Sequence, residues 1–133
     1  MFIEYNPNPT GRRVEDCAVR AVSKALETDW EEAYAKLSMN GYLMGNLLNA
    51  NEVIGALLRS NGFYRTSIPN TCPDCYTVKE FSNDNPRGTF VLGTGTHVVT
   101  VKEGNIFDSY DSSDFVPIYV WYKEEEPKFR EVE

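Results

Sequence analysis

The chain has 133 residues, of which 41% are hydrophobic, and this size and composition predict one globular domain with a modest core. A formal net charge of −7 at pH 7 argues against a surface that binds nucleic-acid phosphates. No apolar run approaches the roughly eighteen residues of a membrane span, and residues 1–7 lack the pattern of a secretory signal. We therefore expect a cytoplasmic protein that neither enters a membrane nor binds nucleic acid.

A loop followed by a helix is predicted at the start of the chain. Residues 5–15 are rich in Asn, Pro and Gly, which favour turns. Apolar residues then recur at helical spacing over 18–26, and Asp16 is expected to cap this helix. Cys17 therefore stands in the first turn, where the free N–H groups and the helix dipole favour a thiolate and can hold an oxyanion.

The rest of the chain predicts more helices and then a group of strands. A second helix begins at Thr28 or Asp29, each with Glu three residues later, and residues 38–48 are expected to be irregular. Further helices are predicted over 51–59 and 77–81. Strands are predicted over 63–68, 89–92, 97–102, 105–110 and 116–122, the last one starting at a sheet edge because of Pro117.

This order of elements predicts an α+β fold. The N-terminal helices, with the cysteine on the first of them, are expected to pack on an antiparallel sheet. A single domain is expected over residues 1–123, followed by a charged, frayed tail over 124–133.

The only histidine of the chain, His97, begins a predicted hairpin. If its turn is the pair Glu103-Gly104, His97 lies opposite Tyr110 in the register. Asp108 is then the diagonal neighbour of His97 on the same face of the sheet. A three-residue turn would shift the parity and weaken this pairing.

These residues suggest nucleophilic catalysis. A thiol, an imidazole base and a carboxylate that orients the imidazole form a complete set for acyl transfer. We therefore predict a triad of Cys17, His97 and Asp108. Asp111 is the alternative acid, although its position at the start of a loop favours Asp108.

The other two cysteines form a CxxC sequence, Cys72-Pro73-Asp74-Cys75. The odd number of cysteines in a chain without a secretory signal predicts free thiols. A structural turn is favoured for this segment, with a redox pair or half of a metal site as the alternatives. A zinc site would have to use Cys17 and His97, so we predict no metal and no cofactor.

The chain order Cys, His, Asp resembles the papain-like cysteine peptidase superfamily, in which the cysteine begins a helix and the histidine and acid lie on strands. Six segments look like those of small proteins from bacteriophages and mobile elements of Gram-positive bacteria: 6–7, 16–21, 68–75, 88–92, 94–99 and 107–112. The resemblance implies Cys17 as nucleophile, His97 as base and Asp108 as orienting acid, in the cytoplasm of a bacterial host cell. It leaves the substrate open.

One departure concerns the oxyanion hole. Papain-like enzymes use a glutamine before the cysteine, and this chain contains no glutamine. Asn6, Asn8 or backbone amides would have to replace it.

Two functions are therefore weighed. The first is a cysteine peptidase or related thiol hydrolase that cleaves a peptide, isopeptide or amide bond of a protein or peptide substrate. The alternative is a catalytically silent papain-like module that binds a host protein in phage defence or counter-defence. A thiol–disulfide role for Cys72 and Cys75 is a weaker third option.

Overall fold

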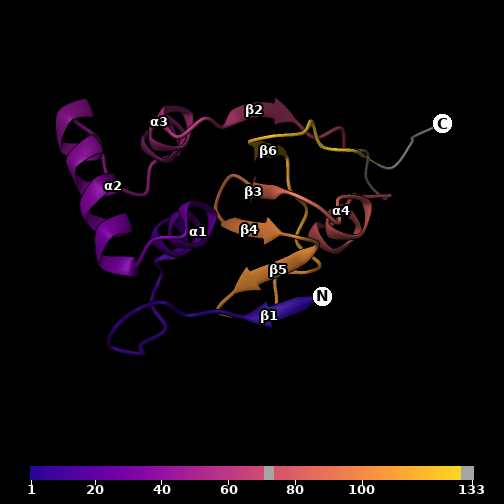
Figure 1. Ribbon diagram of the computed structural model, residues 1–133, viewed down its shortest axis with the longest axis horizontal. Helices are drawn as coiled ribbons and strands as arrows, with labels where there is room; N and C mark the ends of the chain where they lie inside the picture. The colour runs from indigo at the N-terminus through magenta and orange to yellow at the C-terminus, as the bar shows by residue number, and fades with distance from the viewer. Residues whose placement is uncertain (71–73, 130–133) are drawn as a thin grey trace.

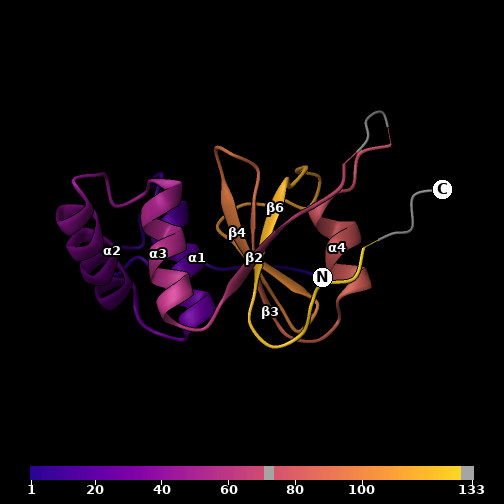
Figure 2. The same cartoon turned by 90° about the horizontal axis from the view of Figure 1, so that it is seen from above.

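The structure is a computed structural model that describes residues 1–70 and 74–129, and it places the helices of this part on both faces of one sheet (Figures 1 and 2). Helices α1 (Cys17–Leu26), α2 (Trp30–Met44) and α3 (Asn51–Ser60) cover one face, with α1 against the strands and α2 outermost. Helix α4 (Val78–Asp84) lies on the other face (Figure 2). The predicted α+β class is confirmed.

Six strands among the described residues form the sheet, in the order β1-β5-β4-β3-β6-β2. Their bounds are β1 (Phe2–Glu4), β2 (Tyr64–Ser67), β3 (Thr89–Gly93), β4 (Val98–Lys102), β5 (Asn105–Asp108) and β6 (Tyr119–Tyr122). All neighbouring pairs are antiparallel except β1 and β5, which run parallel. The sheet is therefore mixed, and our expectation of a purely antiparallel sheet is wrong.

The parallel pair comes from β1, which the sequence pattern did not indicate. Three residues are too few to show the alternation by which a strand is recognised. After β1, the N–H of Tyr5 donates to the carbonyl of Asp108 at 2.7 Å. The 5–16 loop therefore starts beside the end of β5 and leads from there to α1.

Helix α2 is longer than predicted. Asp29 caps it by accepting a hydrogen bond from the N–H of Glu32 at 2.7 Å, as the sequence indicates. The helix continues to Met44, so the expectation of irregular chain is wrong for residues 38–44. Gly41 explains the error, because a Cβ at this position would lie 2.8 Å from the carbonyl oxygen of Asn46. The glycine lets the chain fold back closely after the helix ends.

Strand β6 lies inside the sheet, between β3 and β2, and not at an edge. Pro117 precedes the strand by two residues, so it removes no ladder hydrogen bond and does not restrict the position of β6. The carbonyl of Pro117 instead accepts a hydrogen bond from the side chain of Asn70 at 2.6 Å.

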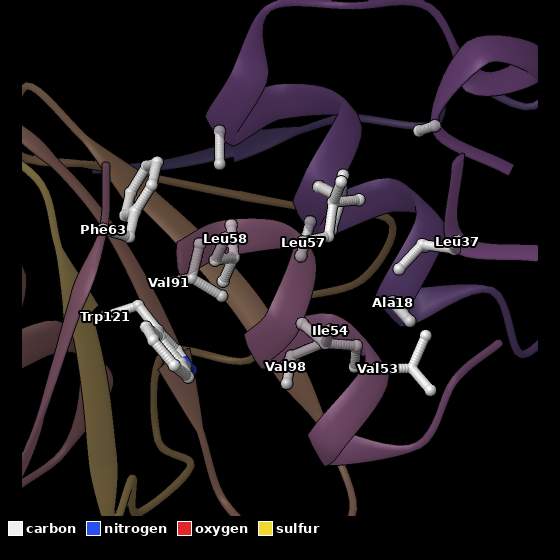
Figure 3. Packing of buried hydrophobic residues seen from close by; sticks show 14 of the residues in the cluster. Ala18, Leu37, Val53, Ile54, Leu57, Leu58, Phe63, Val91, Val98 and Trp121 are labelled. Atoms are coloured by element: carbon white, nitrogen blue, oxygen red, sulfur yellow. The ribbon is translucent and has the colours of Figure 1, made fainter. Parts of the chain in front are cut away.

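The apolar core has one part on each face of the sheet. Figure 3 shows the part under the helices, where Leu58 of α3 and Val91 of β3 are fully buried near Trp121 of β6. Gly55 is required there, because a Cβ on it would lie 2.7 Å from the indole ring of Trp121. The second part lies between α4 and the strands and centres on Phe81.

The described part of the C-terminal tail, residues 124–129, is attached to the domain. Asn85 at the end of α4 exchanges two hydrogen bonds with the backbone of Lys128, each 2.7 Å long. Phe129 packs against the second part of the core. The expectation of a frayed tail is therefore wrong as far as residue 129. In the part of the chain that the structure covers, no helix is long and apolar enough to cross a membrane.

Candidate active site

Cys17 begins α1, as predicted, and is half-buried. Asp16 has a different role from the expected one, because its side chain makes no capping hydrogen bond to the helix. Its carboxylate instead accepts hydrogen bonds from Arg20 and from the indole N–H of Trp30, the latter at 2.8 Å. A charged partner one turn along the helix outcompetes the backbone N–H groups for this carboxylate. Side-chain oxygens therefore do not occupy the first N–H groups of α1.

The hairpin of β4 and β5 has the predicted register. Lys102 pairs with Asn105, so the turn is the two-residue pair Glu103-Gly104. Both turn residues have positive φ, 50° and 76°, which is the backbone of a type I′ hairpin turn. This register brings the imidazole Nε2 of His97 to 2.7 Å from Oδ2 of Asp108.

Asp108 is a buried carboxylate that accepts several hydrogen bonds. Its side chain is 1% exposed, and its Oδ1 atom accepts from Nε and NH2 of Arg20 at 3.0 and 2.8 Å. Its Oδ2 atom accepts from the hydroxyl of Ser112 at 2.7 Å in addition to the imidazole. Burial alone would raise the pKa of Asp108, but the hydrogen bonds from His97 and Ser112 and the charge of Arg20 lower it. The carboxylate therefore stays ionised.

The thiol and the imidazole shift each other's pKa. Burial alone would lower the pKa of His97, but hydrogen bonds with Asp108 and Cys17, and the charges of both, raise it to about 9. Burial alone would raise the pKa of Cys17, but interactions with His97, the backbone of Val98 and the charge of Arg20 lower it below the ordinary value of 9.0. Each group therefore stabilises the charged form of the other.

A tyrosine hydroxyl contacts the imidazole nitrogen that does not face Asp108. The hydroxyl of Tyr110 lies 3.1 Å from Nδ1 of His97, and the ring of Phe115 stands edge-on to the imidazole at 5.2 Å between centroids. The sequence placed Tyr110 opposite His97 but gave it no role. Since Nε2 is bound to Asp108, Nδ1 is the nitrogen left for the thiolate.

Asp111, the alternative acid, does not contact the imidazole. Its carboxylate is in the loop after β5 and accepts hydrogen bonds from the N–H of Ser113, at 3.0 Å, and from the hydroxyl of the same residue. These hydrogen bonds lower its pKa. The structure therefore places Asp108, and not Asp111, beside His97.

The two candidate oxyanion donors differ. Asn6 uses its amide nitrogen within the loop, where it donates to the carbonyls of Gly11 and Arg12 at 3.2 and 3.3 Å. Asn8 uses its amide oxygen to accept from the backbone and hydroxyl of Thr10 at 3.0 and 2.8 Å. Within residues 1–70 and 74–129, its amide nitrogen has no hydrogen-bond partner. Of the two candidates, Asn8 is thus the one whose side-chain N–H groups are available to donate to an oxyanion.

The CxxC segment is only partly covered by the structure, because Cys72 lies outside the described residues. Cys75 takes part in a disulfide bond, so the expectation of a free thiol is wrong at that position. Cys17 is a free cysteine. In the described ranges, no group of three or more His, Cys, Asp or Glu side chains is placed to hold a metal ion.

Sequence reasoning missed Arg20 and Ser112. Arg20 is 3% exposed and joins the carboxylates of Asp16 and Asp108. The spacing of Asp16 and Arg20, one helical turn apart, was the available signal for half of this network. Asp108 is 88 residues further along the chain, so the other half had no local signal.

Comparison with known proteins gives no further guide: no family model, curated protein or solved structure matches the chain.

Proposed function

We propose that this protein is a papain-like cysteine peptidase or a closely related thiol hydrolase, which cleaves a peptide, isopeptide or amide bond. One observation carries the proposal. His97 bonds to the buried carboxylate of Asp108 at 2.7 Å, and the same imidazole lowers the pKa of the Cys17 thiol at the start of a helix. Nucleophile, base and orienting acid therefore stand in the order that covalent catalysis needs.

The chemistry follows from this arrangement. The Cys17 thiolate attacks the substrate carbonyl and forms a carbon–sulfur bond, and the carbonyl oxygen takes the negative charge. The imidazolium of His97 gives its proton to the leaving amine as the carbon–nitrogen bond breaks. Water, deprotonated by His97, then attacks the thioester and releases the acid and the free thiol.

The oxyanion needs donors near Cys17. The N–H groups at the start of α1 are not occupied by a side-chain cap, and the helix dipole favours negative charge there. The amide nitrogen of Asn8 is the side-chain donor that we assign to this role. No cofactor is required at any step.

The test is the alkylation rate of Cys17 by iodoacetamide as a function of pH, with the modified peptide identified by mass spectrometry. An ordinary cysteine is only about 3% thiolate at pH 7. His97→Ala should therefore slow alkylation at pH 7 by roughly five- to tenfold, because the lost thiolate fraction outweighs the greater nucleophilicity of a thiolate of higher pKa. Identical pH profiles for wild type and His97→Ala would overturn the proposal.

A matched pair of substitutions tests the acid. Asp108→Asn removes the carboxylate that holds His97, so it should shift the alkylation profile in the same direction as His97→Ala. Asp111→Asn changes an exposed carboxylate three residues away and should leave the profile unchanged. An equal effect of the two changes would contradict the assignment of Asp108.

The alternative, a silent module that binds a host protein, is favoured by the outer surface of α2. Tyr42 and Leu43 on this helix are 83% and 73% exposed, and Met39 is 59% exposed. Exposed apolar side chains on one element are typical of protein-binding surfaces. This alternative becomes the better account if wild-type Cys17 has the reactivity of an ordinary cysteine.

A further inference from the structure

A pocket of about 260 Å³ lies where α3 meets the strands β2 and β6. Its walls include Arg59 of α3, Arg65 of β2, and both Tyr119 and Trp121 of β6. Figure 3 shows Trp121 beside α3, close to the buried side chains of that helix. The volume is below the range of about 300–1,000 Å³ that is common for whole small-molecule ligands. The pocket therefore suits a single functional group of a larger ligand.

Two guanidinium groups converge on this pocket. That of Arg65 lies over the ring of Tyr119, 4.5 Å from its centroid, and that of Arg59 lies 5.3 Å from the centroid of Trp121. Tyr119 and Trp121 are two positions apart on one strand, so they share a face of the sheet. Aromatic rings attract the two cations without neutralising their charge. Within residues 1–70 and 74–129, neither arginine forms an ion pair.

One carboxylate, that of Glu52, also lines the pocket. It accepts a hydrogen bond from the side-chain amide of Asn46 at 2.8 Å, so part of its acceptor capacity is used outside the pair of arginines. Two guanidinium groups and one carboxylate leave the pocket with a local excess of positive charge, although the whole protein has a formal net charge of −7. The pocket is therefore suited to an anion.

The sheet register connects this pocket to the candidate active site. The backbone of Val98 interacts with the Cys17 thiol, and Val98 is paired with Gly93. Gly93 is paired in turn with Tyr119, whose ring lies over the glycine. Two strand spacings of about 4.8 Å, roughly 10 Å in total, therefore separate Val98 from Tyr119. Cys17 packs against the same part of the core as Tyr119.

Electrostatics agree with this placement. Burial raises the pKa of Tyr119, the charge of Arg65 lowers it, and the charge of Cys17 adds to the increase. Tyr119 is thus within electrostatic reach of both the proposed nucleophile and the pocket. Its hydroxyl donates to the side-chain oxygen of Asn51 at 3.1 Å, so the phenol is already engaged and the arginines are the free donors.

A carboxylate is the anion that best fits a peptide substrate. A guanidinium presents N–H donors in a plane, in a spacing that matches the two carboxylate oxygens. Arg59 and Arg65 are exposed, so the pocket is open to a ligand that arrives from solvent. Because an extended peptide advances about 3.3 Å per residue, a carboxylate two or three residues from the attacked bond covers the roughly 10 Å to the pocket.

We propose that this pocket binds a carboxylate group of the substrate, two or three residues away from the bond that Cys17 attacks, and that Arg59 and Arg65 contact it directly. This inference rests on the proposed function of Cys17 and His97. It adds the substrate class: peptides that carry a carboxylate near the cleaved bond, on an acidic side chain or at the chain terminus.

The test uses iodoacetyl peptides, in which the Cys17 sulfur displaces iodide and forms a carbon–sulfur bond. Iodoacetyl-triglycine, with a terminal carboxylate, is compared with its neutral amide. Iodoacetyl-Gly-Glu-amide, with a side-chain carboxylate, is compared with iodoacetyl-Gly-Gln-amide. In each pair, the carboxylate stands about 10 Å from the attacked carbon. At least one carboxylate reagent should alkylate Cys17 about three- to tenfold faster than its neutral partner at low salt.

Matched variants assign the preference to the pocket. Combined Arg59→Gln and Arg65→Gln should abolish it. Arg87→Gln is the control, because Arg87 is exposed, carries the same charge and does not line the pocket. Glu52→Gln should increase the preference, since it removes the competing negative charge, and general damage to the fold would not produce such a gain. Each rate is divided by the iodoacetamide rate of the same protein, which corrects for the reactivity of the thiol.

The outcomes separate this inference from the proposed function. Iodoacetamide alkylation that does not depend on His97 means that the hydrolase itself is wrong. His97-dependent alkylation with equal rates within both reagent pairs overturns only the carboxylate pocket. An equal loss of preference in Arg87→Gln and in the double variant also overturns it, because the preference would then come from the net charge of the protein. A preference in one pair identifies the source of the carboxylate, terminal or side-chain.

Discussion

Arg20 joins two buried carboxylates, and its removal has the largest effect on stability that we predict. Its side chain is 3% exposed, and those of Asp16 and Asp108 are 7% and 1% exposed. Arg20→Met retains much of the apolar stem and a good helix former, while it removes the charge and the donors. Breaking a buried ion pair from one side costs about 3–5 kcal/mol, because the other charge stays buried without its partner. We expect a loss of this size in the free energy of unfolding at pH 7.

The loss should depend on pH in a defined direction. In the wild type the pKa of Asp108 is lowered, so its contribution to stability is present above the ordinary value of 3.8 and is lost as the pH falls through the lowered value. In Arg20→Met the carboxylate of Asp108 lacks this cation, and its pKa rises. The penalty is then relieved as the pH falls and Asp108 becomes protonated. The difference between the two proteins should therefore be largest near pH 7 and clearly smaller near pH 4.

Urea unfolding followed by tryptophan fluorescence measures this difference, since Trp121 is buried and Trp30 bonds to Asp16. Arg13→Met is the matched control, because Arg13 is 62% exposed and its ion-pair partner among the described residues is the exposed Glu4. It should leave the unfolding midpoint nearly unchanged. A loss below about 1 kcal/mol for Arg20→Met at pH 7, or an equal loss at pH 4, would refute the reasoning.

Three more changes have clear expected outcomes. Gly93→Ala should lower the thermal midpoint and reduce the free energy of unfolding by about 1–3 kcal/mol or more, because the new Cβ would lie 2.0 Å from the ring of Tyr119. An unchanged midpoint would contradict this contact. Tyr110→Phe should speed iodoacetamide alkylation of Cys17 about two- to tenfold, because the phenol no longer competes with the thiolate for Nδ1 of His97; slower alkylation would mean that the hydroxyl supports the imidazolium. Cys17→Ser should lose stability as the pH rises above 6.5, the ordinary pKa of His97, because Asp108 still raises the pKa of the imidazole and the resulting stabilisation disappears as the imidazole deprotonates. The stability of the wild type should depend less on pH over this range, because His97 gains a proton on folding while Cys17 loses one. Urea unfolding midpoints measured across pH give both dependences.

The pairing of His97 with Asp108 could be predicted because its determinants are local. The Glu103-Gly104 turn fixes the parity of the hairpin, and parity decides which side chains share a face. Local sequence patterns also predicted that Cys17 begins a helix and that Asp29 caps the next one.

The features that were missed depend on contacts between distant segments. Strand β1 exists because the N-terminus pairs with β5. The paired residues Phe2 and Ile106 are more than one hundred positions apart in the sequence. Helix α2 runs past Gly41 because that glycine packs against the returning chain, which the local pattern does not show. Arg20 was given no role from the sequence, because only the folded chain supplies Asp108 as its partner.

The Asp108 carboxylate connects the two halves of the candidate site. Its Oδ2 atom holds the imidazole of His97, and its Oδ1 atom holds the guanidinium of Arg20 on α1. Arg20 follows Cys17 by three residues, so the two side chains lie on nearly the same face of the helix. In the proposed triad, the carboxylate that orients His97 therefore also contacts the helix that carries Cys17. This carboxylate and the apolar packing of α1 on β4 together link the thiol and the imidazole.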